Sequence, residues 1–160
     1  MLLGGSFIVD YNYSDYNEGN IDFESITEYD KEELYLLNIQ HSADIIVILS
    51  DILSYASTIE SIELIYNKYD KNTKRVPNPD IPAVQSIQLL MLARVVYTAI
   101  SFIRYQHLYE RKINGEFDFS LEPNVNANIS NILRTLGTYY ALIAAIGIYN
   151  RDISQPIIGI

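Results

Sequence analysis

The only two histidines of the chain, His41 and His107, are each followed three residues later by a carboxylate, Asp44 and Glu110. Residues three apart lie on one face of a helix, so each histidine and its acid can act together. Imidazole and carboxylate groups are common ligands of transition metals. The pattern therefore predicts a metal site with two histidines and two carboxylates, if the fold brings the two pairs together.

An antiparallel helical hairpin would bring them to one level. If Tyr69 lies near Pro82, counting back along both helices places His41 beside Glu110 and Asp44 beside His107. A third antiparallel helix then brings Arg134 to the same level.

Three interpretations follow from this register. The five side chains form a buried polar cluster in which Arg134 neutralises a carboxylate, or the four without Arg134 hold a metal ion, or the pairs do not meet. The Glu-x-x-His motif of carboxylate metal proteins is absent, and an arginine would repel a cation. These points favour the polar cluster over the metal ion, which is the one cofactor that remains possible.

Other reaction chemistry has no support in the sequence. The chain has no cysteine, which excludes thiol catalysis, disulfides and Cys-ligated metals. No phosphate-binding loop, dinucleotide-binding glycine motif or hydrolase nucleophile motif occurs. No catalytic residue is assigned, and an enzyme is the less favoured class.

Apolar residues at three- and four-residue spacing predict the elements that position these side chains. We expect a mainly α fold, a three-helix antiparallel bundle with long first and second helices. The first helix should run from about 31 to 69 after an N-cap at Asp30, the second from Asp80 to about 112 before Asn114-Gly115, and the third from about 128 to 149. The predicted inward face of the first helix is Leu34, Leu37, His41, Ile45, Ile48, Ile52, Ala56 and Ile59.

Alternating apolar and polar residues predict a short two-stranded β element, about 6–13 paired with 116–121. The expected organisation is an acidic arm rich in Tyr and Asn over 1–30, a helical bundle domain over 31–151 and an apolar tail over 152–160. Exposed apolar ends and tyrosines favour contacts with another subunit. The predicted interface residues are Tyr11, Tyr13, Ile153, Ile157, Ile158 and Ile160.

Charge and hydropathy bear on partners and location. The net charge of −9 argues against binding nucleic acid, because an acidic surface repels phosphates. The apolar stretches 43–65 and 81–103 are interrupted by charged residues, and Leu136–Tyr149 is short for a bilayer. With no signal peptide evident either, the expectation is that no transmembrane segment is present, that a membrane is not a partner and that the chain is cytoplasmic by default.

The function expected from these observations is a non-enzymatic structural or assembly protein that acts through homo-oligomeric or other protein contacts. One alternative is a metal-binding bundle or small metalloenzyme that uses the four His and acid residues. Another is a helical module that binds an apolar ligand or a partner helix beside the small residues of the third helix, which include Gly137, Ala141 and Gly147.

Overall fold

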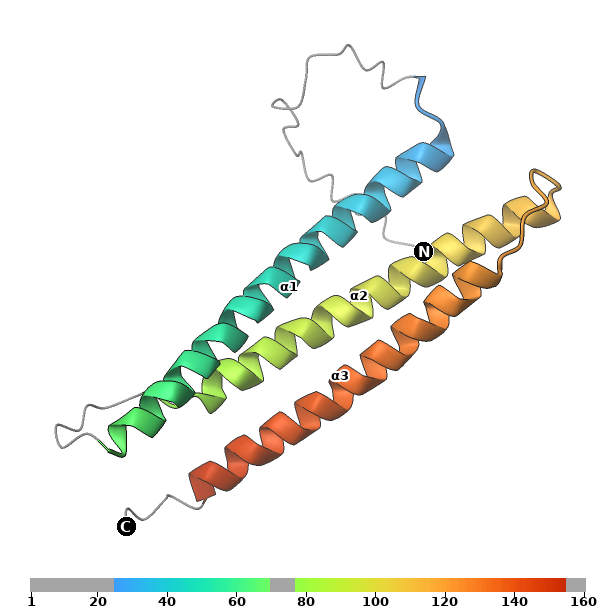
Figure 1. Ribbon diagram of the computed structural model, residues 1–160. Coiled ribbons are helices and arrows are strands. Elements are labelled where there is room, and N and C mark those ends of the chain that lie inside the picture. The colour runs from blue at the N-terminus through green and yellow to red at the C-terminus, as the bar shows by residue number, and fades with distance from the viewer. Residues whose placement is uncertain (1–24, 70–76, 155–160) are drawn as a thin grey trace, which may run out of the picture.

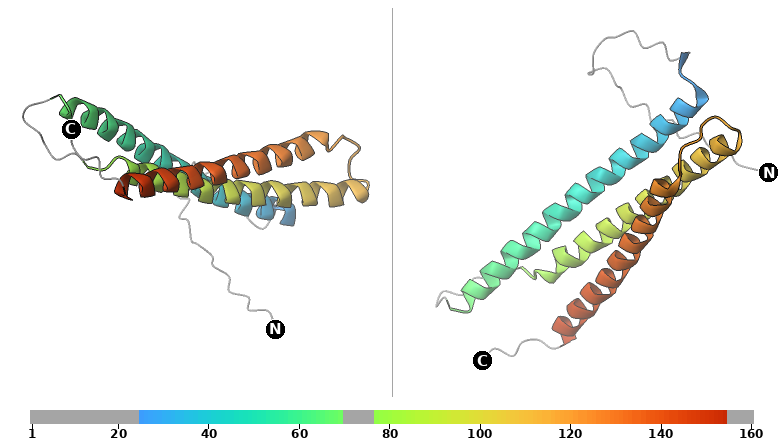
Figure 2. Two further views of the ribbon diagram at one scale, coloured as in Figure 1. Left: turned by 90° about the horizontal axis from the view of Figure 1, so that it is seen from below. Right: turned by 45° about the vertical axis from the view of Figure 1, so that its right-hand side comes forward.

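The computed structural model describes residues 25–69 and 77–154 and contains three long α-helices in these ranges. They are α1 (Glu28–Asn67), α2 (Asp80–Ile113) and α3 (Glu122–Ser154). At 1.5 Å per residue they are roughly 50–60 Å long. The helices run antiparallel, with α2 between the other two (Figures 1 and 2). Both α1 and α3 pack on α2, but these two helices do not pack on each other. The mainly α, three-helix prediction is confirmed.

The first helix begins one turn earlier than predicted. Thr27 is its N-cap, and the Thr27 hydroxyl accepts a hydrogen bond from the backbone N–H of Asp30 at 3.1 Å. The same hydroxyl donates to the Asp30 carboxylate at 2.6 Å. Asp30, the predicted cap, is thus the third helical residue, where its negative charge still lies at the positive end of the helix dipole.

The second helix ends where the sequence predicts. Gly115 follows the C-cap residue Asn114 and has a φ of 77°, a conformation that costs a residue with a Cβ atom about 1–2 kcal/mol. The backbone N–H of Gly115 donates to Lys112 and that of Glu116 to Arg111, at 3.0 and 3.1 Å. These two bonds form the Schellman motif that closes many helices.

Residues 116–121 form a connecting loop and no strand, so this half of the predicted β element is wrong. The Phe117 and Phe119 rings stack with centroids 3.8 Å apart, which places both on one side of the backbone. Arg111 bonds Glu116 at 2.6 Å, and Lys112 donates to the Phe119 carbonyl at 2.9 Å. The loop is therefore held against the end of α2. Its predicted partner, 6–13, lies outside the described residues.

Small and polar side chains occupy the contacts between the helices. The buried residues recur every seventh position, as Leu36, Ala43 and Ser50 on α1 and as Ser86, Ala93 and Ile100 on α2. On α3 the buried residues are Asn128 and Thr138. A seven-residue repeat returns to the same helix face after two turns and is typical of helices that cross at a shallow angle. The contact surface on each helix is correspondingly narrow.

The large apolar side chains lie on the outside. Only five apolar residues are buried in the described part of the chain, whereas 33 large apolar or tyrosine side chains are exposed. The predicted inward face of α1 is wrong, since Ile48 and Ile52 on it are 58% and 57% exposed. The prediction assumed that the most apolar face packs inward, as it does in water. Here the face with the smallest residues packs inward instead.

The expectation that no transmembrane segment is evident is also wrong. All three helices contain stretches long and apolar enough to cross a membrane, by length and composition. Only 6%, 17% and 6% of the residues in these stretches of α1, α2 and α3 are buried inside the molecule. The length of the apolar stretch in the third helix was underestimated, because only Leu136–Tyr149 was considered. In the structure α3 begins at Glu122, and Arg134 is the single charged residue between Glu122 and Arg151.

Candidate functional site

The two His–acid pairs have separate partners. Asp44 accepts a hydrogen bond from the Tyr97 hydroxyl, and Glu110 accepts one from Gln106 at 3.0 Å. His107 Nε2 lies 3.7 Å from the Glu32 carboxylate, and His41 is exposed. Within 25–69 and 77–154, no three His, Asp or Glu side chains gather closely enough to hold a metal ion. The pairs therefore do not form the single cluster that the assumed register predicts.

The register of α1 against α2 explains this result. Asp44 lies level with Tyr97 rather than with His107, a difference of about three helical turns. The expected register placed Tyr69, at the predicted end of the first helix, level with Pro82, in the first turn of the second helix. In the structure α1 ends at Asn67 and α2 begins at Asp80, within two residues of the predicted limits, so the change of register does not come from a change in the helix limits. The register is instead compatible with the positions where small residues allow close approach.

Hydrogen bonds between side chains join the helices. The Ser50 hydroxyl donates to the Ser86 carbonyl at 2.8 Å and lies 3.1 Å from the Ser86 hydroxyl. The Thr98 and Thr135 hydroxyls are 2.9 Å apart. Each pair joins neighbouring helices within their apolar stretches. Such bonds also satisfy polar groups that would be costly to bury alone.

The Ser101 hydroxyl donates to the side chain of Asn128, which is a further bond between α2 and α3. Asn128 is buried, so this contact satisfies an amide that has little access to solvent. All of these contacts use hydroxyl or amide groups rather than charged ones.

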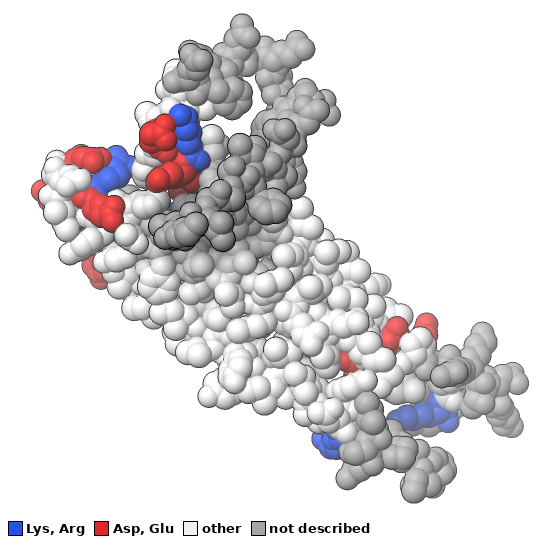
Figure 3. Space-filling model, turned by 180° about the vertical axis from the view of Figure 1, so that it is seen from behind, with Lys and Arg blue, Asp and Glu red and all other residues white. Residues whose placement is uncertain are grey.

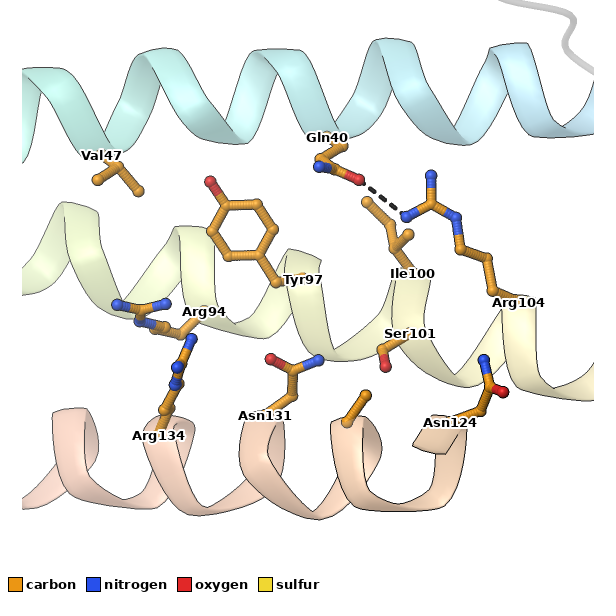
Figure 4. A pocket seen from close by; sticks show the side chains of 11 residues that line it. Gln40, Val47, Arg94, Tyr97, Ile100, Ser101, Arg104, Asn124, Asn131 and Arg134 are labelled. Atoms are coloured by element: carbon orange, nitrogen blue, oxygen red, sulfur yellow. Dashed lines mark hydrogen bonds between the residues drawn. The ribbon is translucent and has the colours of Figure 1, made fainter. Parts of the chain in front are cut away.

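A pocket of about 480 Å³ lies between all three helices. Most of its lining residues have polar side chains, and Figure 4 shows side chains from each helix directed toward it. The lining residues are Gln40 and Val47 on α1; Arg94, Tyr97, Ile100, Ser101 and Arg104 on α2; and Asn124, Ala127, Asn131 and Arg134 on α3. The pocket exists because α1 and α3 both pack on α2 without closing on each other.

Arg104, at one end of the pocket, joins α2 to α1. Its guanidinium donates to the Gln40 side-chain oxygen at 2.9 Å and forms an ion pair with Glu33 at 2.6 Å. The Arg104 Nε atom is buried and has no hydrogen-bond partner. The Glu33 carboxylate balances the positive charge of Arg104. The end of the pocket at Arg104 therefore has no excess of positive charge.

Arg94 and Arg134 lie at the other end of the pocket. Their side chains approach each other from α2 and α3 in Figure 4. Unlike Arg104, neither guanidinium has a carboxylate oxygen of the described residues within 4.0 Å of its nitrogen atoms. Arg134, which the sequence placed with the His–acid pairs, thus lies beside a second cation instead. The pocket has an excess of positive charge at this end.

Sequence reasoning missed Arg94, Arg104 and Gln40 as parts of one site. A signal for them exists, because pocket residues repeat at seven-residue spacing as Arg94 with Ser101, Tyr97 with Arg104 and Asn124 with Asn131. Polar residues two turns apart within an apolar helix share one face. Which helices bring these faces together depends on the tertiary packing.

Of the predicted interface residues, Tyr11, Tyr13, Ile157, Ile158 and Ile160 lie outside the described residues. Ile153 lies in the last turn of α3. The proposed binding face beside the small residues of α3 is open, since a Cβ atom added to Gly137 or Gly147 would meet nothing within 4 Å.

The described site is thus a polar, arginine-lined pocket in a bundle with an apolar exterior. No protein-family model, no curated protein and no solved structure matches this chain.

Proposed function

We propose that this chain is a non-enzymatic structural subunit that is embedded in a membrane and assembles there with further helices. The observation that carries the proposal is the distribution of side chains, with small and polar residues between the helices and large apolar residues outside. In water this distribution is unfavourable, because burying apolar surface contributes about 25 cal/mol per Å². In lipid it costs nothing, since the surroundings are as apolar as the side chains.

The helix contacts are of a kind that suits lipid. Helices in a bilayer gain little from burying apolar groups, so they associate through small residues and interhelical hydrogen bonds. Ala43 and Ala93 are fully or nearly fully buried, and Ser50 bonds Ser86 across the α1–α2 contact. Each backbone polar group within the long helices is also satisfied internally, as lipid requires.

The distribution of charge supports the same environment. On the face shown in Figure 3, acidic and basic side chains lie at the two ends of the molecule, and the wide band between them has none. The helices exceed the roughly 20 residues needed to cross a bilayer, so their charged ends would extend beyond the hydrocarbon. The polar residues of the pocket lie between these charged ends, on the sides of the helices that face one another.

The assembly part of the proposal rests on the open arrangement. Because α1 and α3 leave the pocket uncovered between them, another helix has room to pack beside α2. Polar groups at a lipid-facing opening are costly, which favours covering them with protein. A second copy of the chain would provide such helices.

Membrane fractionation tests the membrane part of the proposal. The full chain, produced in cells, should sediment with membranes, resist extraction by alkaline carbonate and float with lipid vesicles after detergent removal. Ile52→Glu places a charge on the exposed face in the middle of α1 and should reduce the membrane-bound fraction strongly. Ile113→Glu makes the same change at the end of α2, where Ile113 is 68% exposed, and should have little effect.

A chain that is recovered from the soluble fraction as a defined oligomer would contradict the membrane part. In that result Ile52→Glu would break the oligomer rather than reduce membrane binding. The exposed apolar residues would then be covered by other protein subunits in water.

A further inference from the structure

We infer that the pocket between the three helices binds a small oxyanion, a phosphate or carboxylate group, between Arg94 and Arg134. The inference goes beyond the proposed structural role and does not depend on whether lipid or protein covers the exterior. It rests on the charge, the donors and the volume of the pocket.

The charge of the pocket is unbalanced at one end. Arg104 has Glu33 as its ion-pair partner. Asp44 accepts a hydrogen bond from the neutral Tyr97 hydroxyl and forms no ion pair within 4.0 Å with either Arg94 or Arg134. Arg94 and Arg134 line the pocket from neighbouring helices, and neither has a carboxylate among the described residues within 4.0 Å. Two guanidinium groups on one wall repel each other unless an anion lies between them.

The donors around this end suit an oxyanion. A guanidinium presents its N–H groups in a planar fork that matches the oxygen atoms of carboxylate and phosphate groups. The side chain of Asn131 also lines the pocket near Arg134, and rotation of its amide group would direct an N–H donor toward a bound anion.

The size of the pocket sets the size of the ligand. A volume of about 480 Å³ falls within the range of small-molecule sites and is larger than an inorganic anion needs. The remaining wall includes the apolar side chains of Val47, Ile100 and Ala127. An inorganic phosphate or an oxyanion on a small organic molecule would therefore both fit.

Binding measurements on the full chain test this inference, in detergent micelles or buffer, whichever keeps it monodisperse. Sodium phosphate and sodium acetate are titrated separately, and sodium chloride at equal ionic strength serves as the reference. At least one of the two oxyanions should raise the unfolding temperature more than chloride does and give saturable binding by calorimetry. The one that binds more tightly distinguishes phosphate from carboxylate as the preferred group.

Variants locate the site. Arg94→Gln and Arg134→Gln should each weaken binding at least about tenfold, since each removes a charge-assisted fork. Arg134→Lys keeps the charge but loses the fork, and should bind with intermediate affinity. Arg151→Gln removes an equal charge at the end of α3, outside the pocket, and should bind as the parent chain does.

The stability of the anion-free variants distinguishes a binding site from a structural pair. Without oxyanion, Arg134→Gln should unfold at the same temperature as the parent chain or higher, because it removes repulsion. The inference is overturned if neither oxyanion differs from chloride, if Arg94→Gln and Arg134→Gln bind as the parent chain does, or if anion-free Arg134→Gln unfolds at a markedly lower temperature.

Discussion

Hydroxyl groups at the helix contacts are the residue-scale feature that sets this molecule apart from a bundle with an apolar core. Ser50 is 1% exposed, and its hydroxyl contacts both the carbonyl and the hydroxyl of Ser86. A side chain of this size allows the backbones of α1 and α2 to approach closely. The same position therefore provides both a hydrogen bond and the space for the contact.

Ser50 offers a test of these two contributions. Ser50→Ala removes the hydrogen bond but keeps the small volume, and should lower the free energy of unfolding by about 1 kcal/mol. Ser50→Leu places a larger side chain at a contact that has no free space, and should lower the free energy of unfolding by about 1–3 kcal/mol or more. Both values would come from denaturant or thermal unfolding followed by circular dichroism.

Ser54, one turn further along α1, is exposed and provides the control. Ser54→Ala and Ser54→Leu should change the unfolding free energy by less than about 0.5 kcal/mol. Equal losses at Ser50 and Ser54 would show that the Ser50 contact does not hold the two helices together.

The bond between Asp44 and Tyr97 is a second residue-scale contact between α1 and α2. A double-mutant cycle with Asp44→Asn and Tyr97→Phe should give a coupling energy of about 1 kcal/mol, measured as unfolding free energies. The coupling should vanish in a cycle that pairs Asp44→Asn with Tyr105→Phe, two turns further along α2. Additive effects of Asp44→Asn and Tyr97→Phe would mean that the bond contributes nothing.

At the scale of the elements, the helix ends follow local sequence. Thr27 caps α1 through its hydroxyl, and Gly115 closes α2 through a conformation that other residues adopt with difficulty. These devices act over a few residues and need no tertiary contact. They fix where a helix ends but not what it packs against.

Substitutions at two glycines, one in the turn after α2 and one inside α3, test how local backbone conformation contributes to stability. Gly115→Ala should lower the free energy of unfolding by about 1–2 kcal/mol, because φ is 77° there. Gly147→Ala, inside α3, should raise it by about 0.5–1 kcal/mol, because alanine favours a helix and the added Cβ meets nothing within 4 Å.

Thermal unfolding of both variants checks this contrast. A loss of stability in Gly147→Ala would indicate that another chain contacts this face of α3 in the assembled protein. An unchanged stability in Gly115→Ala would mean that the turn after α2 can form in another way.

At the scale of the whole molecule, the exposed apolar side chains must be covered by something other than water. The five buried apolar residues provide only a small core for helices of this length. Among the described residues, α1 and α3 do not pack on each other to close the bundle. The lipid and further subunits that we propose would cover this surface.

Deletion of the C-terminal tail tests the contribution of further subunits. A chain that ends at Arg151 lacks the predicted interface residues Ile153, Ile157, Ile158 and Ile160. Its mass is measured by light scattering in the medium that keeps the full chain monodisperse. The number of subunits calculated from this mass should be lower than that of the full-length assembly. Equal subunit numbers for both chains would exclude the tail as the main interface.

Local patterns in the sequence were sufficient for the number of helices, for their approximate limits and for the glycine that ends α2. The start of α3 was missed because 122–129 contains Pro123 and four asparagines or small residues, a composition that suggests a loop. The prediction of a strand over 116–121 was wrong because alternation favours a strand only where a partner strand is available.

The sequence by itself determined the helices and their ends, because capping, glycine conformation and helical spacing act over a few residues. Only the tertiary structure decided which faces meet and in which register. That choice depends on where small residues such as Ala43 and Ala93 allow two backbones to approach. It placed Arg134 beside Arg94 instead of beside the histidines, and it turned the most apolar faces outward. No pattern within one helix contains that information, since it belongs to the contact between helices.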